Sequence, residues 1–138
     1  MSDKGYVYQY RQGQAHSVTH YVPDVQKLGI TKISKKAPKV GQGYTIVHNH
    51  PSGSHFSTTD LNSWNSVPSQ KRVVAVARGS RIAYTVTKTA KFNSKGFQKA
   101  LNKIQLKTNS MENYNKSMES FLKSNAKKYG YTYSAKKV

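Results

Sequence analysis

A short apolar run that ends in two histidines constrains the fold of this chain more than any other segment. Residues 44–47 (YTIV) predict a buried strand, and the run leads directly into His48, Asn49 and His50. Side chains along a strand alternate between its two faces, so we expect His48 and His50 to point to the same side. The run therefore predicts a strand whose carboxyl end delivers two imidazoles to one cleft.

A helix is expected directly after the loop that follows these histidines, over residues 57–67. Ser57 is a good N-cap residue, Asp60 stands three positions later, and Leu61 and Trp64 share one face of the helix, which favours a core position for Trp64. The Ser-x-x-acid spacing permits two interpretations. It is an ordinary helix start that needs no metal, or it brings a carboxylate close to the two histidines.

Two histidines and a nearby carboxylate are the donor set of a catalytic metal site. Three protein ligands leave the fourth position of a tetrahedral zinc open for water, whereas a closed four-ligand site has no room for a reactant. The chain has no cysteine, so a metal must be held by nitrogen and oxygen atoms. We expect zinc, with another divalent metal as the alternative.

The segment 48–53 (HNHPSG) followed by 57–60 (STTD) resembles the zinc motif of the JAB/MPN (JAMM) metalloprotease-like domains, in the form typical of the RadC-like branch. The resemblance implies that His48, His50 and Asp60 bind zinc. It also implies that Ser57 helps to orient the substrate or the oxyanion, and that a glutamate on an upstream strand acts as the general base.

The chain departs from this family pattern in two ways. Six residues (51–56) separate the second histidine from the serine, where the family usually has seven, and the first glutamate is Glu112. The upstream acids that remain as candidate bases are Asp3 and Asp24. His55, in the motif loop, is a further candidate for a base or a fourth ligand, or else an exposed loop histidine.

The whole pattern predicts an α/β (α+β) fold with a mixed sheet, a helix after the metal motif and a C-terminal helical pair, as in JAB/MPN-like domains. We expect one domain over residues 1–138, in which 1–92 form the JAB-like sheet and motif helix and 93–138 form a basic helical extension. The other predicted elements are a hairpin of strands 5–11 and 15–21, a short helix near 24–28, a brief strand near 31–34 and a second hairpin of strands 72–77 and 81–87.

Apolar residues at helical spacing predict the C-terminal pair. The first helix starts at residue 93 and carries Phe97, Ala100, Leu101 and Ile104. In the second helix, Asn109 and Glu112 resemble a capping box, Gly130 is the predicted stop, and the apolar stripe consists of Met111, Tyr114, Met118, Phe121 and Leu122. We expect the tail, residues 131–138, to be frayed or to add a strand.

The charge of the chain points to a polyanionic partner. It has 23 Lys and Arg against 5 Asp and Glu, a formal net charge of +18. Nucleic acid, DNA or RNA, is the expected partner, and an acidic protein, an anionic membrane surface or an acidic cell-wall polymer satisfies the same electrostatics. No apolar run approaches the length of a membrane span.

Most of the basic residues lie in residues 71–138, and we expect these to hold nucleic acid. Lysines recur every four residues from Lys91 to Lys107, which on a helix makes a ridge, although the same spacing is also typical of a solvated face. The candidate nucleic-acid-binding residues are Arg72, Arg78 and Arg81 around the second hairpin, and Lys91, Lys95, Lys99 and Lys103 on the ridge.

The function expected from these features is metal-dependent hydrolysis of nucleic acid by a nuclease of phage, mobile-element or toxin-effector type. The alternatives are a peptide- or isopeptide-cleaving metalloprotease, and a non-catalytic nucleic-acid-binding module on a degenerate JAB scaffold. The N-terminus lacks the apolar core of a signal peptide. We therefore expect a cytoplasmic protein, or one exported without a classical signal as part of a larger protein.

Overall fold

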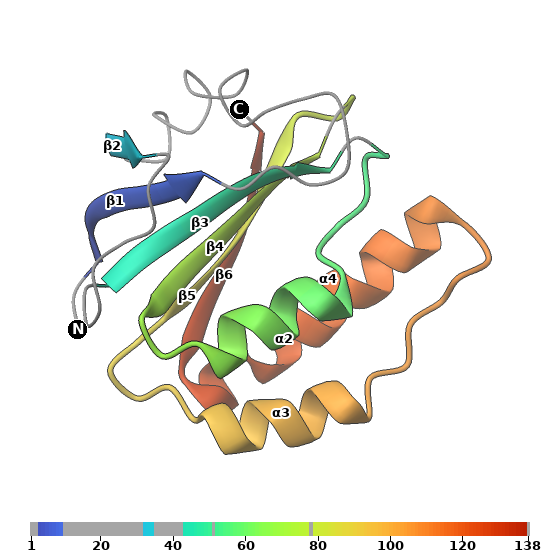
Figure 1. Cartoon of the computed structure of the whole chain (residues 1–138). Helices are drawn as coiled ribbons and strands as arrows, with labels where there is room; N and C mark the ends of the chain where they lie inside the picture. Colours follow the sequence, from blue (N-terminus) through green and yellow to red (C-terminus); the bar gives the residue numbers. More distant parts are fainter. Residues whose placement is uncertain (1–2, 10–31, 35–42, 51, 78, 138) are drawn as a thin grey trace.

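The computed structural model describes residues 3–9, 32–34, 43–50, 52–77 and 79–137 (Figure 1). Within these ranges strands and helices are mixed along the chain. The strands are β1 (Asp3–Gln9), β2 (Lys32–Ser34), β3 (Gly43–His50), β4 (Gln70–Ala77), β5 (Ile82–Lys88) and β6 (Tyr131–Lys137); the helices are α2 (Thr58–Ser66), α3 (Ser94–Asn102) and α4 (Met111–Tyr129).

The strands of the described residues form one mixed sheet in the order β2-β1-β3-β4-β5-β6. The pairs among β2, β1, β3 and β4 are parallel, whereas β4–β5 and β5–β6 are antiparallel. The predicted mixed sheet is therefore confirmed, as are the second hairpin, which is β4 and β5, and the brief strand near 31–34, which is β2. The tail adds a strand, β6, at the edge of the sheet.

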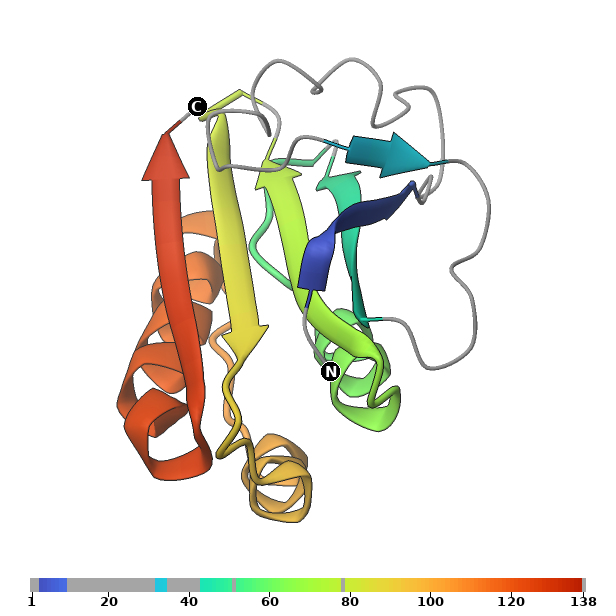
Figure 2. The same cartoon turned by 90° about the vertical axis from the view of Figure 1, so that its left-hand side faces the viewer.

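All three helices cover the same face of the sheet (Figures 1 and 2). Alternate residues of β4, namely Val73, Ala75 and Ala77, face these helices and lie in the main apolar core. The C-terminal helices supply Phe97, Leu101, Met118 and Leu122 to the same core. Residues 93–137 are thus built into the sheet and the core. None of the helices within the described ranges is long and apolar enough to cross a membrane.

The first C-terminal helix is shorter than predicted. Its N-cap is Asn93, the residue at which the helix was predicted to start, but it ends at Asn102, so Ile104 lies beyond it. From residue 103 to 107 burial alternates, with Ile104 and Leu106 half-buried and the residues between them exposed. Ile104 and Leu106 therefore reach the core from the connection between α3 and α4, and not from the helix.

The N-cap of the second C-terminal helix lies one residue after the predicted cap, Asn109. Ser110 is the N-cap, and its side chain accepts a hydrogen bond from the backbone N–H of Asn113. The proposed capping box of Asn109 and Glu112 is wrong. Gly130 ends the helix in the left-handed conformation, as predicted.

Two predictions of the N-terminal part fall on residues outside the described ranges. These are the strand over 15–21 and the short helix near 24–28. Strand β1, which was expected to pair with residues 15–21, is flanked in the sheet by β2 and β3.

Candidate metal centre

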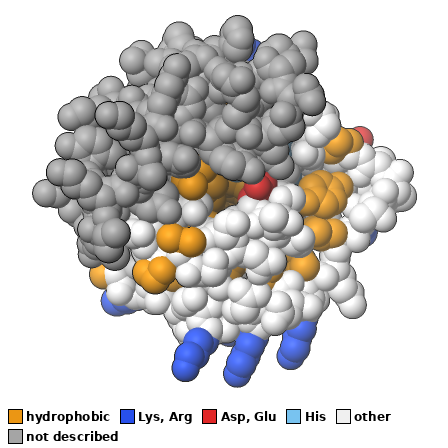
Figure 3. Space-filling model, viewed as in Figure 1, with side chains coloured by type: hydrophobic (Ala, Val, Ile, Leu, Met, Phe, Trp, Pro, Cys, Tyr) orange, Lys and Arg blue, Asp and Glu red, His pale blue; other side chains and the backbone are white. Residues whose placement is uncertain are grey.

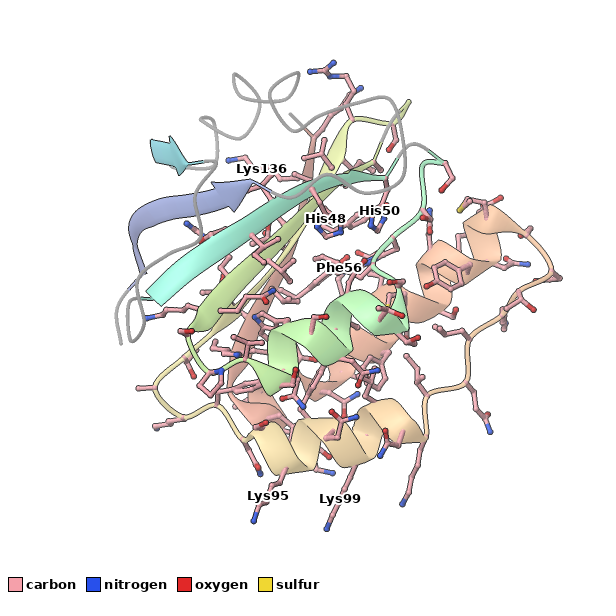
Figure 4. The ribbon with its side chains drawn as sticks, in the orientation of Figure 1. His48, His50, Phe56, Lys95, Lys99 and Lys136 are labelled. Atoms are coloured by element: carbon pink, nitrogen blue, oxygen red, sulfur yellow. The ribbon has the colours of Figure 1, made fainter. Side chains whose placement is uncertain are left out.

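The two histidines of β3 and the aspartate at the start of α2 meet on the helical face of the sheet (Figure 4). The Nε2 atoms of His48 and His50 are 2.9 Å apart. The Oδ2 atom of Asp60 lies 3.4 Å from Nε2 of His48 and 3.1 Å from Nε2 of His50. Both histidine side chains are buried, so three donor atoms face one another in a protected place.

The strand period and the helix cap together produce this arrangement. His48 and His50 pair in register with Ala75 and Ala77 of β4, which also face the helices. Ser57 caps α2 in a full capping box: its Oγ accepts from the N–H of Asp60 at 3.0 Å, and its own N–H donates to Oδ2 of Asp60 at 2.9 Å. The helix start therefore fixes the carboxylate that faces the histidines, and the two interpretations of the Ser-x-x-acid motif are compatible.

The three donor atoms have the spacing that a small divalent cation requires. Zinc holds nitrogen and oxygen ligands at about 2.0–2.2 Å, which separates neighbouring ligand atoms of a tetrahedron by about 3.3–3.6 Å. The observed separations of 2.9, 3.1 and 3.4 Å match this range or fall slightly below it, so small side-chain rotations suffice. The residues present fit zinc.

A second contact orients one of the imidazoles for metal binding. Nδ1 of His50 lies 2.8 Å from the backbone oxygen of Ser54 and donates its proton there. A neutral imidazole with its proton on Nδ1 presents a lone pair on Nε2, the atom that faces the cluster. Metal-binding histidines commonly make this outer hydrogen bond, because it fixes the tautomer and the ring orientation.

The charges of the cluster are coupled. Burial alone would raise the pKa of Asp60, but hydrogen bonds from His48 and His50, the charge of His48 and the hydrogen bond from the N–H of Ser57 hold it well below its usual range. Burial alone would lower the pKa of His50, but the hydrogen bond and charge of Asp60 outweigh burial and raise it. Asp60 is therefore an anion at neutral pH, as a metal ligand must be.

His55 is placed differently from its prediction as an exposed loop histidine. It is 1% exposed and stacks on Tyr84 and Tyr133, with ring centroids 3.8 and 5.6 Å away. Nδ1 accepts from the N–H of Phe56 at 2.7 Å, and Nε2 lies 2.7 Å from the hydroxyl of Tyr133. Both ring nitrogens are engaged, so this histidine holds the motif loop in place, and its roles as ligand or base have no geometric support.

We predict that His55 makes the protein sensitive to acid. Burial lowers its pKa from 6.5 to about 3, with a smaller contribution from the charge of His50. Between these values the unfolded chain binds a proton that the folded chain does not, so stability falls as the pH falls. Between pH 7 and pH 5 wild type should lose about 2 kcal/mol more than His55→Gln.

Urea unfolding of both proteins at the two pH values measures this difference. Every other titrating group is common to the two proteins and cancels to first order. Equal losses of stability in wild type and His55→Gln would show that the imidazole of His55 is not held neutral by the fold.

Two residues of α4 secure the motif loop and were missed by the sequence analysis. The N–H of His55 donates to Oδ1 of Asn115 at 2.8 Å, and the hydroxyl of Tyr114 donates to the backbone oxygen of Phe56 at 2.7 Å. Tyr114 was expected only in the apolar stripe. These partners are about 60 residues away in the chain, and nothing in a local pattern identifies such a contact.

Apart from the ligand Asp60, none of the carboxylate side chains that the structure describes lies at the metal centre, so none of them is placed to act as a general base. Glu112 and Glu119 form ion pairs with Lys116 and Lys123 along α4, at 3.0 and 3.1 Å. The described part of the chain contains one group of metal-binding side chains, and Asp60 is its sole acid. Asp24 lies outside the described residues, and only the backbone of Asp3 is described.

One group of basic residues lies along α3. Lys and Arg side chains gather along the edge formed by α3 (Figure 3), and Lys95 and Lys99 lie on its outer side, with α2 between them and the histidines (Figure 4). Of the predicted lysine ridge, only these two belong to α3, because the helix ends at Asn102. Lys91 precedes the helix and Lys103 is its C-cap.

The two described arginines of the second hairpin lie at opposite ends of it. Arg72 pairs with Thr87 at the opposite end of the hairpin, and its Nε donates to Oγ1 of Thr45 at 3.0 Å. Arg81 lies in the turn and is exposed, whereas Arg78 is outside the described residues.

Two further cations that the sequence analysis did not select lie at the metal-centre end of the sheet. The register runs from His50 through Ala77 and the start of β5 to Lys136 and Lys137 at the exposed end of β6. Side chains alternate along β6, so Lys137 shares the helical face with Tyr131 and Tyr133, whereas Lys136 lies on the opposite face (Figure 4). The sequence left open whether the tail is frayed or forms a strand, and the position of these lysines depends on that strand.

No protein-family model matches the chain, and no curated protein or solved structure matches it.

Proposed function

We propose that this protein is a metal-dependent hydrolase with a JAB/RadC-like zinc motif, and that its substrate is nucleic acid. One observation carries the proposal: Nε2 of His48, Nε2 of His50 and Oδ2 of Asp60 face one another within 3.4 Å in a buried place. Three such ligands hold zinc or a similar divalent cation and leave a coordination position for a reactant.

A cation held there supplies a Lewis acid that polarises the scissile bond and makes water a better nucleophile near neutral pH. The residues of the chain provide the rest. Asp60 balances part of the metal charge, and the capping box fixes its position. Ser57 accepts in that box, so its own O–H proton can donate to a substrate oxygen.

The absence of a second carboxylate from the cluster, among the described residues, limits the expected rate. Proton transfer by a positioned base typically contributes about 10²–10⁴-fold to catalysis. We therefore expect slow turnover from the metal and the substrate-positioning residues alone.

Charge supports nucleic acid as the substrate. The net charge of +18 attracts polyanions, and Arg81 and Lys137 lie at the metal-centre end of the sheet. Strands are about 4.8 Å apart, so β6 lies about 14 Å from β3. A polynucleotide strand with one phosphate at the metal centre is long enough to reach these cations two or three phosphates away.

Metal content combined with a substrate panel tests the proposal. The purified protein should contain about one zinc per chain and should cleave DNA or RNA with Zn²⁺, Mn²⁺ or Mg²⁺, but not after treatment with a chelator. Cleavage of an isopeptide-linked substrate alone would identify a metalloprotease instead. Metal-free protein that binds nucleic acid tightly, with a strong salt dependence and no cleavage, would identify a binding module.

Removing charge at the metal-centre end of the sheet and removing charge from α3 should affect catalysis differently. We expect the double change Arg81→Gln with Lys137→Gln to lower kcat/KM by about 10-fold, because each lost phosphate contact removes about one unit of salt dependence and weakens binding near the metal. The matched double change Lys95→Gln with Lys99→Gln removes the same charge from α3 and should cost less than about 3-fold.

Cleavage assays at several salt concentrations measure both effects. A larger loss for the α3 pair would mean that the nucleic acid follows the lysines that the sequence analysis selected. Equal small losses would remove both groups from the substrate path.

A further inference from the structure

A cavity lies near the C-terminal end of α2, whereas the metal centre lies near its N-terminal end. It has a volume of about 460 Å³ and opens between the end of α2, the start of β4, the end of β5 and the start of α3. Its size is in the range of small-molecule sites, which are about 300–1,000 Å³. Neither the metal ligands nor the motif loop line it.

A buried lysine lines this cavity. Lys88 is 8% exposed, and its Nζ donates to the backbone oxygen of Val67 at 2.8 Å. The ammonium also lies 5.4 Å from the ring centroids of Trp64 and Phe92. Val67 is the C-cap of α2, so one N–H of Lys88 interacts with the negative end of that helix.

The helix contact accounts for one of the three N–H groups of Lys88. Burial of a cation is unfavourable unless an anion or several hydrogen bonds compensate it. None of the described residues that line the cavity is acidic. Burial lowers the pKa of Lys88 to about 8, so the ammonium is still charged at neutral pH.

The rest of the lining indicates what kind of ligand fits. The hydroxyl groups of Ser94 and Thr89 already donate to Oδ1 of Asn65 and the backbone oxygen of Gly130, at 2.9 and 2.7 Å. A second cation, Lys71, lines the cavity together with the apolar Pro68 and Phe92. The cavity therefore combines positive charge with an apolar wall.

We propose that this cavity binds a small organic anion, with a phosphate monoester or carboxylate group paired with Lys88 and a planar apolar body against Phe92. The site is separate from the metal centre and does not depend on the function proposed for it. The anionic head supplies the negative charge that the lining lacks, and the apolar body covers the ring of Phe92.

The chain contains a single tryptophan, and it lies beside the proposed site, so its fluorescence reports on binding there. Phenyl phosphate, benzoate and the neutral benzyl alcohol are titrated into the full-length protein with excitation of Trp64. We expect saturable changes with one or both anions and none with benzyl alcohol. Saturation by phenyl phosphate but not benzoate would assign the head group as phosphate, and the reverse would assign it as carboxylate.

Two variants separate a specific site from general attraction to a basic protein. Lys88→Met keeps the length of the side chain and removes its charge, and it should weaken anion binding at least 10-fold. The matched control Lys95→Gln removes an exposed charge from α3 and should bind as wild type does. Ala90→Phe narrows the cavity and leaves the ammonium in place, so it should also weaken binding. This variant replaces Lys88→Met in the test if Lys88→Met does not fold.

Circular dichroism and thermal unfolding establish that each variant is folded. The proposal is overturned if folded Lys88→Met binds the anions as wild type does, or if Lys95→Gln loses as much affinity as Lys88→Met. It is also overturned if benzyl alcohol binds as well as the anions, or if neither anion changes the fluorescence of Trp64.

Discussion

Asp60→Asn is expected to lower zinc affinity by at least about 100-fold and to abolish metal-dependent cleavage, while leaving the start of α2 intact. Loss of an outer hydrogen-bond partner of a metal ligand typically costs 10–100-fold in affinity, and loss of a ligand itself costs more. An asparagine side chain still offers an oxygen to the N–H of Ser57, which Oδ2 of Asp60 now accepts at 2.9 Å. The variant therefore removes the charge of the ligand but keeps the cap.

Ser57→Ala is the matched control, because it removes the cap and keeps the ligand. It should destabilise the protein by about 1 kcal/mol, through loss of the hydrogen bond that the N–H of Asp60 now donates, and it should still bind zinc. Elemental analysis, competition with a zinc-binding dye and urea unfolding measure the two variants side by side. If Asp60→Asn retains stoichiometric zinc, the contact of Asp60 with His48 and His50 serves the fold alone and the metal mechanism is wrong.

These two variants also separate the proposed function from the proposed metal site. Zinc that binds in wild type and is lost in Asp60→Asn, without cleavage of any substrate in the panel, would keep the metal site and reject the hydrolase. Cleavage that survives in Asp60→Asn would reject the assignment of the metal ligands instead.

The parts of the site that depend on nearest neighbours in the chain were predictable. His48 and His50 share a face because strand side chains alternate, and Ser57 and Asp60 form a capping box because helix starts need acceptors for their unpaired N–H groups. Both rules act within four residues. The strand–loop–helix unit that carries the metal ligands follows from them.

The parts that depend on tertiary packing were not predictable. His55 stands next to glycine and serine residues, which favours an exposed loop, but two tyrosines of β5 and β6 enclose it. Ile104 stands at helical spacing from Phe97 and Leu101, yet it lies beyond the end of α3 and packs against the core from the connection that follows the helix. Asn109 and Ser110 are both good caps, and propensity does not rank adjacent candidates of similar strength.

Gly130→Ala is expected to destabilise the protein by about 3 kcal/mol or more. Gly130 ends α4 with φ of 77°, a conformation that costs other residues about 1–2 kcal/mol. A Cβ atom there would also meet the backbone of the segment before α3: it would overlap the oxygen of Lys91 and lie 2.6 Å from its carbonyl carbon and 2.9 Å from the nitrogen of Phe92. Backbone atoms cannot rotate away, so overpacking of about 1–3 kcal/mol is added.

The close approach at Gly130 matters because this residue links the end of α4 to the segment that follows β5. Its N–H donates to Ala126 at 2.9 Å, and its oxygen accepts from the N–H and the hydroxyl of Thr89 at 3.0 and 2.7 Å. Gly79→Ala is the matched control, since Gly79 has φ of 90° but no atom within 4 Å of an added Cβ. That change should cost only about 1 kcal/mol, the conformational part alone. Urea unfolding of both variants measures the difference, and equal costs would mean that the end of α4 does not pack against residues 91–92 as closely as the structure shows.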